Sequence, residues 1–222
     1  MSVLFQHLLP LRRADARSPA RPPILLVIGA HREELAFGEA VAKRLNRQRI
    51  DLLRIPVGLS GQRPGPGGLA RYRQRHAELY QQIMEHVQPG QRVLIDLHTG
   101  FDERLCWADI LCAEPALLRC IEQESAELPA PNGAFVRGVQ LVADDGSGVP
   151  SRDGRQAPES RPCVKPALPE SVWNAKHLIY VGIEVYLAQP SYGTPAEAGF
   201  AAAVVETVGE SALSVRRVTE PS

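Results

Sequence analysis

The stretch that decides the fold is ILLVIGAHREELAF, residues 24–37, which begins as an uninterrupted apolar run and turns polar towards its end. An apolar run that ends at a glycine is typical of a strand buried on both faces of a sheet. Residues 33–48 then place apolar side chains at roughly helical intervals with charges between them, which predicts a helix. The sequence therefore puts His31, Glu33 and Glu34 at the junction of a buried strand and a helix.

The same alternation of strand and helix continues along the chain. Apolar runs and amphipathic stretches follow one another, and turn residues separate them. Further strands are expected at 50–57, 92–98, 108–113, 133–143 and 177–188, and further helices at 69–87, 115–128 and 194–213. Strands that are joined through helices pair in parallel by right-handed crossovers. This order predicts an α/β sandwich that forms a single domain over residues 24–222.

Three segments fall outside this regular pattern. Residues 1–23 contain broken apolar stretches followed by arginines, the reverse of a secretory signal, and we interpret them as an irregular leader. Residues 58–68 are so dense in Gly and Pro that a loop is expected there. Residues 144–171 show no periodicity and predict a second, longer loop. Loops of this length are uncommon unless they form a lid, carry a binding surface or lack order.

The last helix carries its own start signal. Thr194 suits the N-cap position, Pro195 the first helical position, and Glu197 follows three residues after the cap. In such a capping box the threonine and the glutamate each accept a hydrogen bond from a backbone N–H group at the helix start. We therefore expect a helix to begin at Pro195.

The composition excludes several classes of function. The 222 residues are 44% apolar and 23% charged, as in ordinary globular proteins, and 25 basic residues balance 25 acidic ones. With no net charge, no bulk field attracts nucleic acid or an anionic membrane, and no apolar run approaches the ~20 residues that span a bilayer. The four cysteines form no Cys-x-x-Cys pair, so reduced thiols and a cytoplasmic location are expected.

Polar groups fall where parallel strands are expected to end, the edge at which open α/β sheets bind ligands. His31 and Glu34 are three residues apart at a helix start, so they share one face and can converge on one point. His98 ends the strand VLIDLH, and Glu184 interrupts the apolar strand YVGIEVYLA. Two histidines and a glutamate are a donor set of catalytic zinc, which keeps a fourth position for water. Glu33 should point elsewhere on the helix and remain solvated.

The motifs GAHREE, DLHTG and IEVY, in this order, carry a resemblance to a known family. They resemble the zinc carboxypeptidase superfamily, in particular its succinylglutamate desuccinylase/aspartoacylase-like branch. The pattern of that family is H-x-x-E after the first core strand, a histidine at the end of a later strand and a glutamate on a strand near the C-terminus. The similarity extends over residues 24–187. It implies a mixed, mostly parallel central sheet with helices on both faces.

The resemblance also implies a role for each matching residue. His31, Glu34 and His98 would bind one Zn²⁺. Glu184 would be the general base, which takes a proton from the attacking water and later gives it to the leaving amine. The substrate would be a small molecule or short peptide that bears a carboxylate next to the cleaved amide bond. The enzyme would then be a small carboxypeptidase or an N-acyl-amino-acid deacylase.

Further side chains have expected roles beside these four. The superfamily uses arginines to polarise the scissile carbonyl and to hold a substrate carboxylate, and Arg63 lies about where such a residue is expected. Arg71 and Arg73 are the alternatives for this role. Asp96 precedes His98 by two residues and so shares its face of the strand. A carboxylate there can accept a hydrogen bond from the ligand histidine and fix the orientation of its ring.

Other interpretations stay open. The same fold could be a non-catalytic metal- or ligand-binding module, and Glu184 could be the acid of a buried salt bridge. A nucleotide-binding protein is disfavoured because the first turn lacks the glycines of a phosphate loop, and a serine hydrolase because no G-x-S-x-G elbow occurs. The remaining histidines show no partner pattern and are expected at the surface or in packing: His7, His76, His86 and His177.

Overall fold

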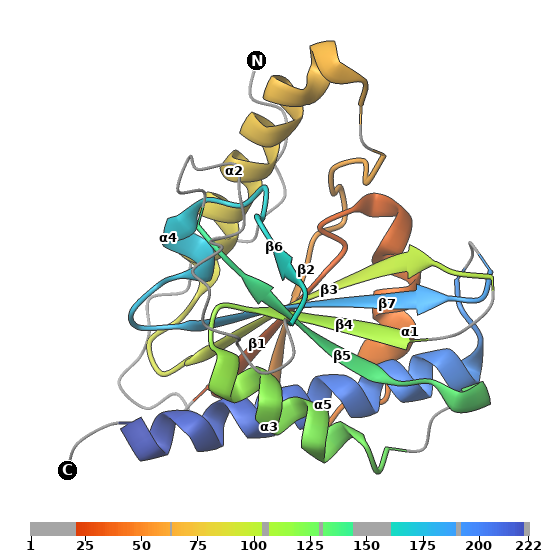
Figure 1. Ribbon diagram of the computed structural model, residues 1–222. Helices are drawn as coiled ribbons and strands as arrows, with labels where there is room; N and C mark the ends of the chain where they lie inside the picture. Colours follow the sequence, from red (N-terminus) through yellow and green to blue (C-terminus); the bar gives the residue numbers. More distant parts are fainter. Residues whose placement is uncertain are drawn as a thin grey trace, which may run out of the picture.

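A computed structural model describes residues 21–62, 64–103, 107–128, 131–143, 161–189 and 192–219 of the chain. Within these residues, one seven-stranded sheet lies at the centre of the molecule in the order β2-β1-β3-β7-β4-β5-β6 (Figure 1). Neighbouring strands are parallel except for β4 and β7, which pair antiparallel. The predicted α/β fold with a mixed, mostly parallel sheet is confirmed.

Apart from β6 and α4, which are not predicted, the strands and helices overlap the ranges that the sequence predicts, and α1 ends six residues before the predicted helix does. The strands are β1 (Ile24–Ile28), β2 (Ile50–Arg54), β3 (Val93–Phe101), β4 (Trp107–Cys112), β5 (Val136–Leu141), β6 (Cys163–Val164) and β7 (Ile179–Leu187). The helices are α1 (Leu35–Ala42), α2 (Leu69–His86), α3 (Pro115–Ser125), α4 (Glu170–Trp173) and α5 (Pro195–Thr219). Short 3₁₀ turns lie at Arg32–Glu34, Pro66–Gly68 and Pro131–Gly133.

Helices cover both faces of the sheet. α1, α3 and α5 pack on one face, and α2 and α4 pack on the other (Figure 1). Leu26 and Ile28 of β1 belong to the core under the first group, whereas Leu25 and Val27 belong to the core under α2. Successive side chains of a strand point to opposite faces, so a strand covered on both sides must be apolar throughout. β1 meets this condition, because all of its residues are buried.

α5 begins with the expected capping box. The backbone N–H of Glu197 donates to Thr194 Oγ1 at 3.2 Å, and the backbone N–H of Thr194 donates to Glu197 Oε2 at 2.6 Å. Residues Pro195–Val215 are also long and apolar enough to cross a membrane, with a mean hydropathy of 1.2, although no uninterrupted apolar run marks them in the sequence. In the fold, 61% of the most apolar window of this segment is buried. α5 therefore serves as a core helix against the sheet.

The two expected loops contain short regular elements. The end of the 144–171 segment contains β6, which pairs with β5, and the beginning of α4. A strand as short as β6 shows no periodicity, so the sequence pattern could not reveal it. The 58–68 loop ends in the 3₁₀ turn Pro66–Gly68. Residues 144–160 lie outside the described residues, as do residues 1–20 of the expected leader, so these parts of the interpretation stay predictions.

The 58–68 loop starts directly against the end of β1. A Cβ atom on Gly58 would lie 2.0 Å from the carbonyl oxygen of Gly29, so only glycine allows the two backbones to approach this closely. The next residue, Leu59, forms an isolated parallel bridge with His31. The loop thereby fixes the backbone of His31 at the point where β1 has ended.

Candidate metal centre

His31 and Glu34 follow β1 at the edge where the parallel strands end. β1 ends at Ile28, and the 3₁₀ turn Arg32–Glu34 carries the chain into α1. This turn brings the two side chains together, with His31 Nδ1 and Glu34 Oε1 at a distance of 2.9 Å. Glu34 is only 9% exposed, so its carboxylate lies inside the fold.

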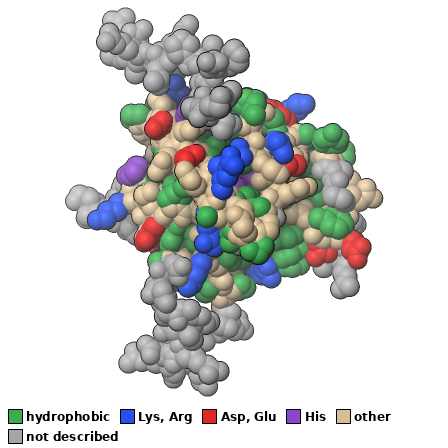
Figure 2. All heavy atoms as spheres, turned by 90° about the horizontal axis from the view of Figure 1, so that it is seen from above, with side chains coloured by type: hydrophobic (Ala, Val, Ile, Leu, Met, Phe, Trp, Pro, Cys, Tyr) green, Lys and Arg blue, Asp and Glu red, His purple; other side chains and the backbone are tan. Residues whose placement is uncertain are grey.

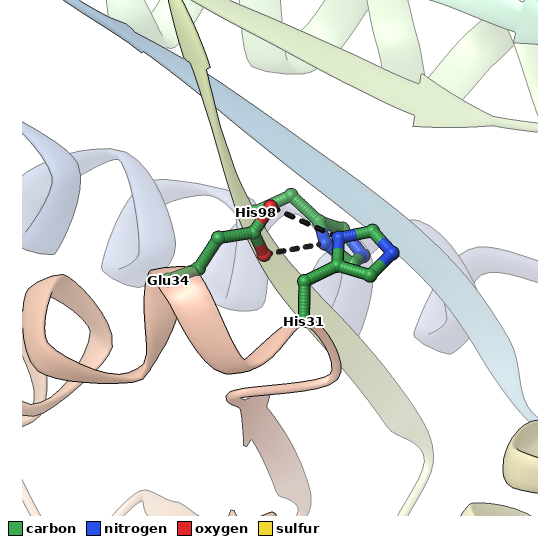
Figure 3. A group of neighbouring side chains, drawn as sticks. All are labelled: His31, Glu34 and His98. Carbon is green, nitrogen blue, oxygen red and sulfur yellow. Dashed lines mark hydrogen bonds and ion pairs between the residues drawn. The ribbon is translucent and has the colours of Figure 1, made fainter. Parts of the chain in front are cut away.

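His98 completes the cluster from β3, the neighbour of β1 in the sheet. Its Nδ1 lies 2.9 Å from Glu34 Oε2, so each carboxylate oxygen faces one imidazole ring (Figure 3). One donor atom from each of His31, Glu34 and His98 lies within 4.8 Å of the other two. The structure thus brings together the three residues that the sequence assigns to a metal, and their role as ligands stays a prediction. β3 continues past His98 to Phe101, so this histidine lies within its strand rather than at its end.

The donor set fits Zn²⁺. Two atoms bound to a tetrahedral zinc at 2.0–2.1 Å lie about 3.4 Å apart, so donors that lie within 4.8 Å of one another would have to move inward to surround one ion. Two imidazole nitrogens and one carboxylate oxygen leave a fourth tetrahedral position, as in catalytic zinc sites. The Nε2 atoms of both rings contact other side chains, Asp96 for His98 and His76 for His31, so the Nδ1 atoms are the ones that face Glu34.

Asp96 holds His98 on the side away from Glu34. Its Oδ2 lies 2.8 Å from His98 Nε2, and the same oxygen accepts hydrogen bonds from the hydroxyl groups of Tyr180, at 3.1 Å, and Tyr80. Asp96 is buried, and among the described residues its Oδ1 has no hydrogen-bond partner. The alternation of β3 accounts for this placement, because residues 96 and 98 share a face. The two tyrosines were not expected from the sequence.

The cluster concentrates negative charge in a buried place. Burial raises the pKa of Asp96, but the charge and hydrogen bond of His98, together with Tyr80 and His31, bring it below its usual value. Burial also raises the pKa of Glu34, and hydrogen bonds with His31 and His98 bring it below its usual value. Burial lowers the pKa of His98, yet Asp96 and Glu34 hold it well above its usual value. The two carboxylates thus favour positive charge on His98, and a divalent cation bound there would supply positive charge in its place.

Glu184 lies beside the cluster on β7. β3 and β7 pair in parallel, and their register sets Glu184 directly against His98. Gly182 and Tyr180 precede Glu184 on the same face of β7, because strand side chains alternate. Burial raises the pKa of Glu184, as the apolar character of this strand predicts.

A bidentate ion pair lies next to Glu184. Asp109 of β4 is directly opposite Glu184, and Arg137 of β5 is directly opposite Asp109. Arg137 donates from Nε and Nη2 to the Asp109 carboxylate at 2.7 and 2.8 Å, and its guanidinium lies 4.4 Å from the ring centroid of Trp107. The arginine on this part of the sheet thus pairs with Asp109 and not with Glu184, the acid that the salt-bridge alternative named.

A pocket of about 380 Å³ opens onto the cluster. His31, His98 and Glu184 contribute to its walls, and Arg73 and Lys165 add positive charge. Figure 2, which looks down on the molecule from the side of α2, shows Lys and Arg side chains around the middle of this face. An anionic group of a substrate would therefore meet cationic side chains on its way to the cluster.

The arginines expected to act on the substrate fall in different places. Arg63 lies outside the described residues, and its role stays a prediction. Arg73 lines the pocket that contains Glu184, whereas Arg71 lines a neighbouring pocket of about 450 Å³ together with Arg75. Of the two alternatives, Arg73 is thus the one that shares a pocket with the cluster.

His76 is the main functional candidate that the sequence interpretation missed. The sequence predicts a surface or packing position for it, and its 5% exposure agrees with packing, but its Nε2 also lies 3.2 Å from His31 Nε2. His76 and Tyr80 are four residues apart on the buried face of α2. Polar side chains at this spacing among apolar ones are a signal that could have identified both residues. Tyr180 could similarly have been found from the face that it shares with Glu184.

Glu33 is expected from the sequence to be solvated, but its carboxylate also accepts hydrogen bonds from the 58–68 loop. Its side chain is 46% exposed, yet it accepts hydrogen bonds from Ser60 Oγ at 3.0 Å and from the backbone N–H of Gly61 at 3.2 Å. Slight burial raises the pKa of Glu33, but these hydrogen bonds, with those from its own N–H and from Arg32, lower it to about 2. Glu33 thereby fastens the 58–68 loop to the turn that carries Glu34.

No protein-family model matches the sequence, and no curated protein is similar to it in sequence. Solved structures with a similar fold include murine aminoacylase 3, with 12% identity and a TM-score of 0.42 over 90% of this chain and 66% of that one. The CwlD amidase from Clostridioides difficile matches with 11% identity and a TM-score of 0.47, over 86% of this chain and 98% of that one.

An aspartoacylase family protein from Mesorhizobium loti matches with 14% identity and a TM-score of 0.39, over 85% of this chain and 50% of that one. The chain thus spans slightly less than two thirds of the aminoacylase and half of the aspartoacylase family protein.

Proposed function

We propose that the protein is a zinc-dependent hydrolase that cleaves an amide bond next to a carboxylate, as a small carboxypeptidase or an N-acyl-amino-acid deacylase. The observation that supports this most strongly is the pairing of His98 with Glu184 on the adjacent strands β3 and β7. This pairing sets a carboxylate of raised pKa beside a cluster of two histidines and a glutamate, in one pocket.

His31, Glu34 and His98 would hold the ion, and Asp96 would keep the ring of His98 in place. Zn²⁺ lowers the pKa of adjacent water to about 7 and polarises a carbonyl group. The protein contributes a fixed arrangement of donors, a buried negative environment that favours a cation, and a pocket that leads to it.

Glu184 would move the proton. Its ionised carboxylate accepts a proton from the attacking water, and the resulting carboxylic acid donates that proton to the nitrogen of the leaving amine. Burial raises the pKa of Glu184, so the protonated form that the second transfer needs is more accessible than in an exposed glutamate. Gly182 also lines the pocket, and its missing side chain leaves space for substrate beside Glu184.

The cationic side chains support a substrate that carries a carboxylate. Arg73 and Lys165 line the pocket, and an arginine or lysine binds a carboxylate through charge-assisted hydrogen bonds. We assign to Arg63, or to Arg73 in its place, the polarisation of the scissile carbonyl or the binding of the substrate carboxylate. A small N-acyl amino acid or a short peptide carries the required acid next to its amide bond.

The proposal includes a cytoplasmic location and no nucleic-acid or membrane partner. Cys112, Cys120 and Cys163 are free thiols, as expected in a reducing compartment. The formal net charge of the chain is zero, which provides no general attraction for phosphate backbones or anionic lipid. The segment of α5 that is long and apolar enough to cross a membrane is largely buried inside the fold.

The metal content of the purified protein tests the first part of the proposal. Wild type prepared without chelator should contain about one zinc per chain, and His98→Ala should contain almost none. His86→Ala is the matched control, because His86 is a partly buried histidine on α2 that contacts the backbone oxygen of Gln82. A wild type that contains no zinc and takes up none when it is added would overturn the proposal.

Turnover tests the second part. A panel of N-acyl amino acids and short peptides should include substrates whose hydrolysis stops when a chelator removes the metal. Glu184→Gln should keep its zinc and lose about 10²–10⁴-fold in kcat, the usual contribution of a general base. Zinc bound without turnover of any compound in the panel would instead support the non-catalytic binding module.

A further inference from the structure

We propose that His76 is a positioning residue for the metal centre: its Nε2 lone pair accepts a hydrogen bond from the Nε2–H of His31 and so keeps the Nδ1 lone pair of His31 directed at the cation site. This inference rests on the zinc site of the proposed function. α2 contributes no proposed ligand, but through His76 it would determine which nitrogen of His31 is protonated.

The first step concerns the proton of His76 itself. Its Nδ1 lies 2.8 Å from the backbone carbonyl oxygen of Tyr72, one helical turn earlier on α2. A carbonyl oxygen only accepts hydrogen bonds, so Nδ1 must carry the hydrogen. His76 is 5% exposed, and a charged ring is costly to bury, so the ring is taken as neutral. A neutral imidazole with a hydrogen on Nδ1 has a lone pair on Nε2.

The second step concerns His31. Its Nε2 lies 3.2 Å from His76 Nε2, and two ring nitrogens form a hydrogen bond only if one donates and the other accepts. Since His76 Nε2 is the acceptor, His31 Nε2 is the donor. When a cation is bound, a neutral His31 would then have its lone pair on Nδ1, the atom that faces Glu34 Oε1 at 2.9 Å. This is the protonation state that a metal ligand needs.

The third step is the comparison of the two ligand histidines. Both rings turn Nδ1 towards Glu34, and both have an acceptor at Nε2: Asp96 Oδ2 at 2.8 Å for His98 and His76 Nε2 at 3.2 Å for His31. His76 is a neutral acceptor, so it holds the ring of His31 without adding a carboxylate to Glu34 and Asp96, which already contact the two ligand histidines.

The ring of His76 is itself held in place. It is 5% exposed and lies against Tyr72, with ring centroids 4.0 Å apart and an interplanar angle of 37°. The backbone contact fixes one nitrogen, and the packing limits rotation of the ring. An acceptor on a rigid helix positions the ligand more precisely than a loop residue would.

Zinc affinity of two variants tests the inference by competition with a chromophoric chelator. His76→Leu removes the acceptor and should weaken zinc binding about 10–100-fold, the usual effect of losing a partner behind a metal ligand. His76→Gln places an amide oxygen where Nε2 lies and should retain most of the affinity. The matched control is His86→Leu, which lies ~15 Å further along α2 and has the same type of backbone contact, at 2.7 Å from Gln82 O. Its affinity should equal that of wild type.

Nitrogen-15 NMR of the zinc-loaded wild type tests the same inference without a mutation, so it remains decisive if His76→Leu does not fold. The spectra should show the hydrogen of His76 on Nδ1 and that of His31 on Nε2. A hydrogen on His76 Nε2 would overturn the inference. So would two zinc ions per chain in wild type and one in His76→Gln, because an ion would then lie between the two Nε2 atoms.

The outcomes separate the inference from the proposed function. A wild type without affinity for zinc contradicts the proposed function. A wild type that binds zinc and hydrolyses a substrate, while His76→Leu binds zinc as tightly, contradicts only the role of His76.

Discussion

Glu184 is expected to reduce the stability of the fold in which it acts. Burial raises its pKa above the ordinary value of 4.5, so the folded state favours the protonated form. Below pH 4.5 the carboxyl is protonated in both the folded and the unfolded chain, and no penalty arises. As the pH rises through the ordinary and then the raised pKa, the unfolded chain loses its proton first, and the fold loses stability.

Glu184→Gln should therefore stabilise the zinc-free protein at neutral pH while it removes activity. The expected gain in the free energy of unfolding is roughly 1 kcal/mol, as at other functional sites, or an increase of about 2–4 °C in Tm. Thermal unfolding with chelator present, at neutral pH and near pH 4, measures it, and the gain should shrink at the lower pH. Glu85→Gln, at an exposed position on α2, is the control. A variant less stable than wild type at neutral pH would contradict this account of Glu184.

Single residues of the site could be predicted where a local sequence pattern marks them. His31, Glu34, His98 and Glu184 each interrupt or follow an apolar strand, and one-dimensional periodicity is enough to mark such positions. His76 differs, because its contact with His31 depends on how α2 crosses the sheet. No local pattern specifies that crossing.

Between the elements β3 and β7, one glycine makes room for the site. Gly100 is paired with Tyr186 in the strand register, and a Cβ on Gly100 would lie 2.7 Å from the Tyr186 ring and 3.2 Å from Glu184 Oε1. Tyr186 has little freedom to move away, because its ring stacks on Trp107 with centroids 4.1 Å apart and an interplanar angle of 7°. Any side chain at position 100 would therefore press on the face that carries Glu184, the proposed general base.

Gly100→Ala should lower kcat about 10–100-fold through displacement of Glu184, since even small misplacements of a catalytic group are costly. The zinc content should stay at the wild-type level, and overpacking should cost about 1–3 kcal/mol of stability. Steady-state kinetics and elemental analysis of the same preparation measure the two effects. Gly199→Ala is the control, because nothing lies within 4 Å of the Cβ it would add. Wild-type kcat in Gly100→Ala would show that this contact does not position the base.

The elements themselves were more predictable than their arrangement. The capping box of α5 and the amphipathic pattern of α2 act within a few residues, so the sequence alone located both helices. Periodicity could not reveal the antiparallel direction of β4 against β7, because an apolar run looks the same in either direction. That direction depends on how the chain connects the strands in three dimensions. The same connection places Asp109 opposite Glu184 in the strand register.

Across the whole molecule, the cluster links the turn after β1 to β3, because Glu34 and His98 are 64 residues apart in the chain. A cation that binds the folded state and not the unfolded chain adds its binding energy to the stability of the fold. Zinc at 100 times its Kd should add about 2.7 kcal/mol, or raise Tm by roughly 5–10 °C. Calorimetry with zinc or with chelator measures this shift, and His98→Ala should abolish it. An equal rise of Tm with zinc in His98→Ala would show that zinc binds at another site.

β3 lies between β1 and β7 in the sheet, although β2 and α2 separate β1 from β3 in the chain and three strands separate β3 from β7. The proposed metal ligands and Glu184 therefore come together only after distant segments have formed adjacent strands. Such pairing between distant segments is the slow part of folding for these topologies. A chain that is still collapsing offers the cation an incomplete site. The ion is thus expected to prolong the lifetime of the finished sheet by slowing its opening, and to leave the rate at which the sheet assembles almost unchanged.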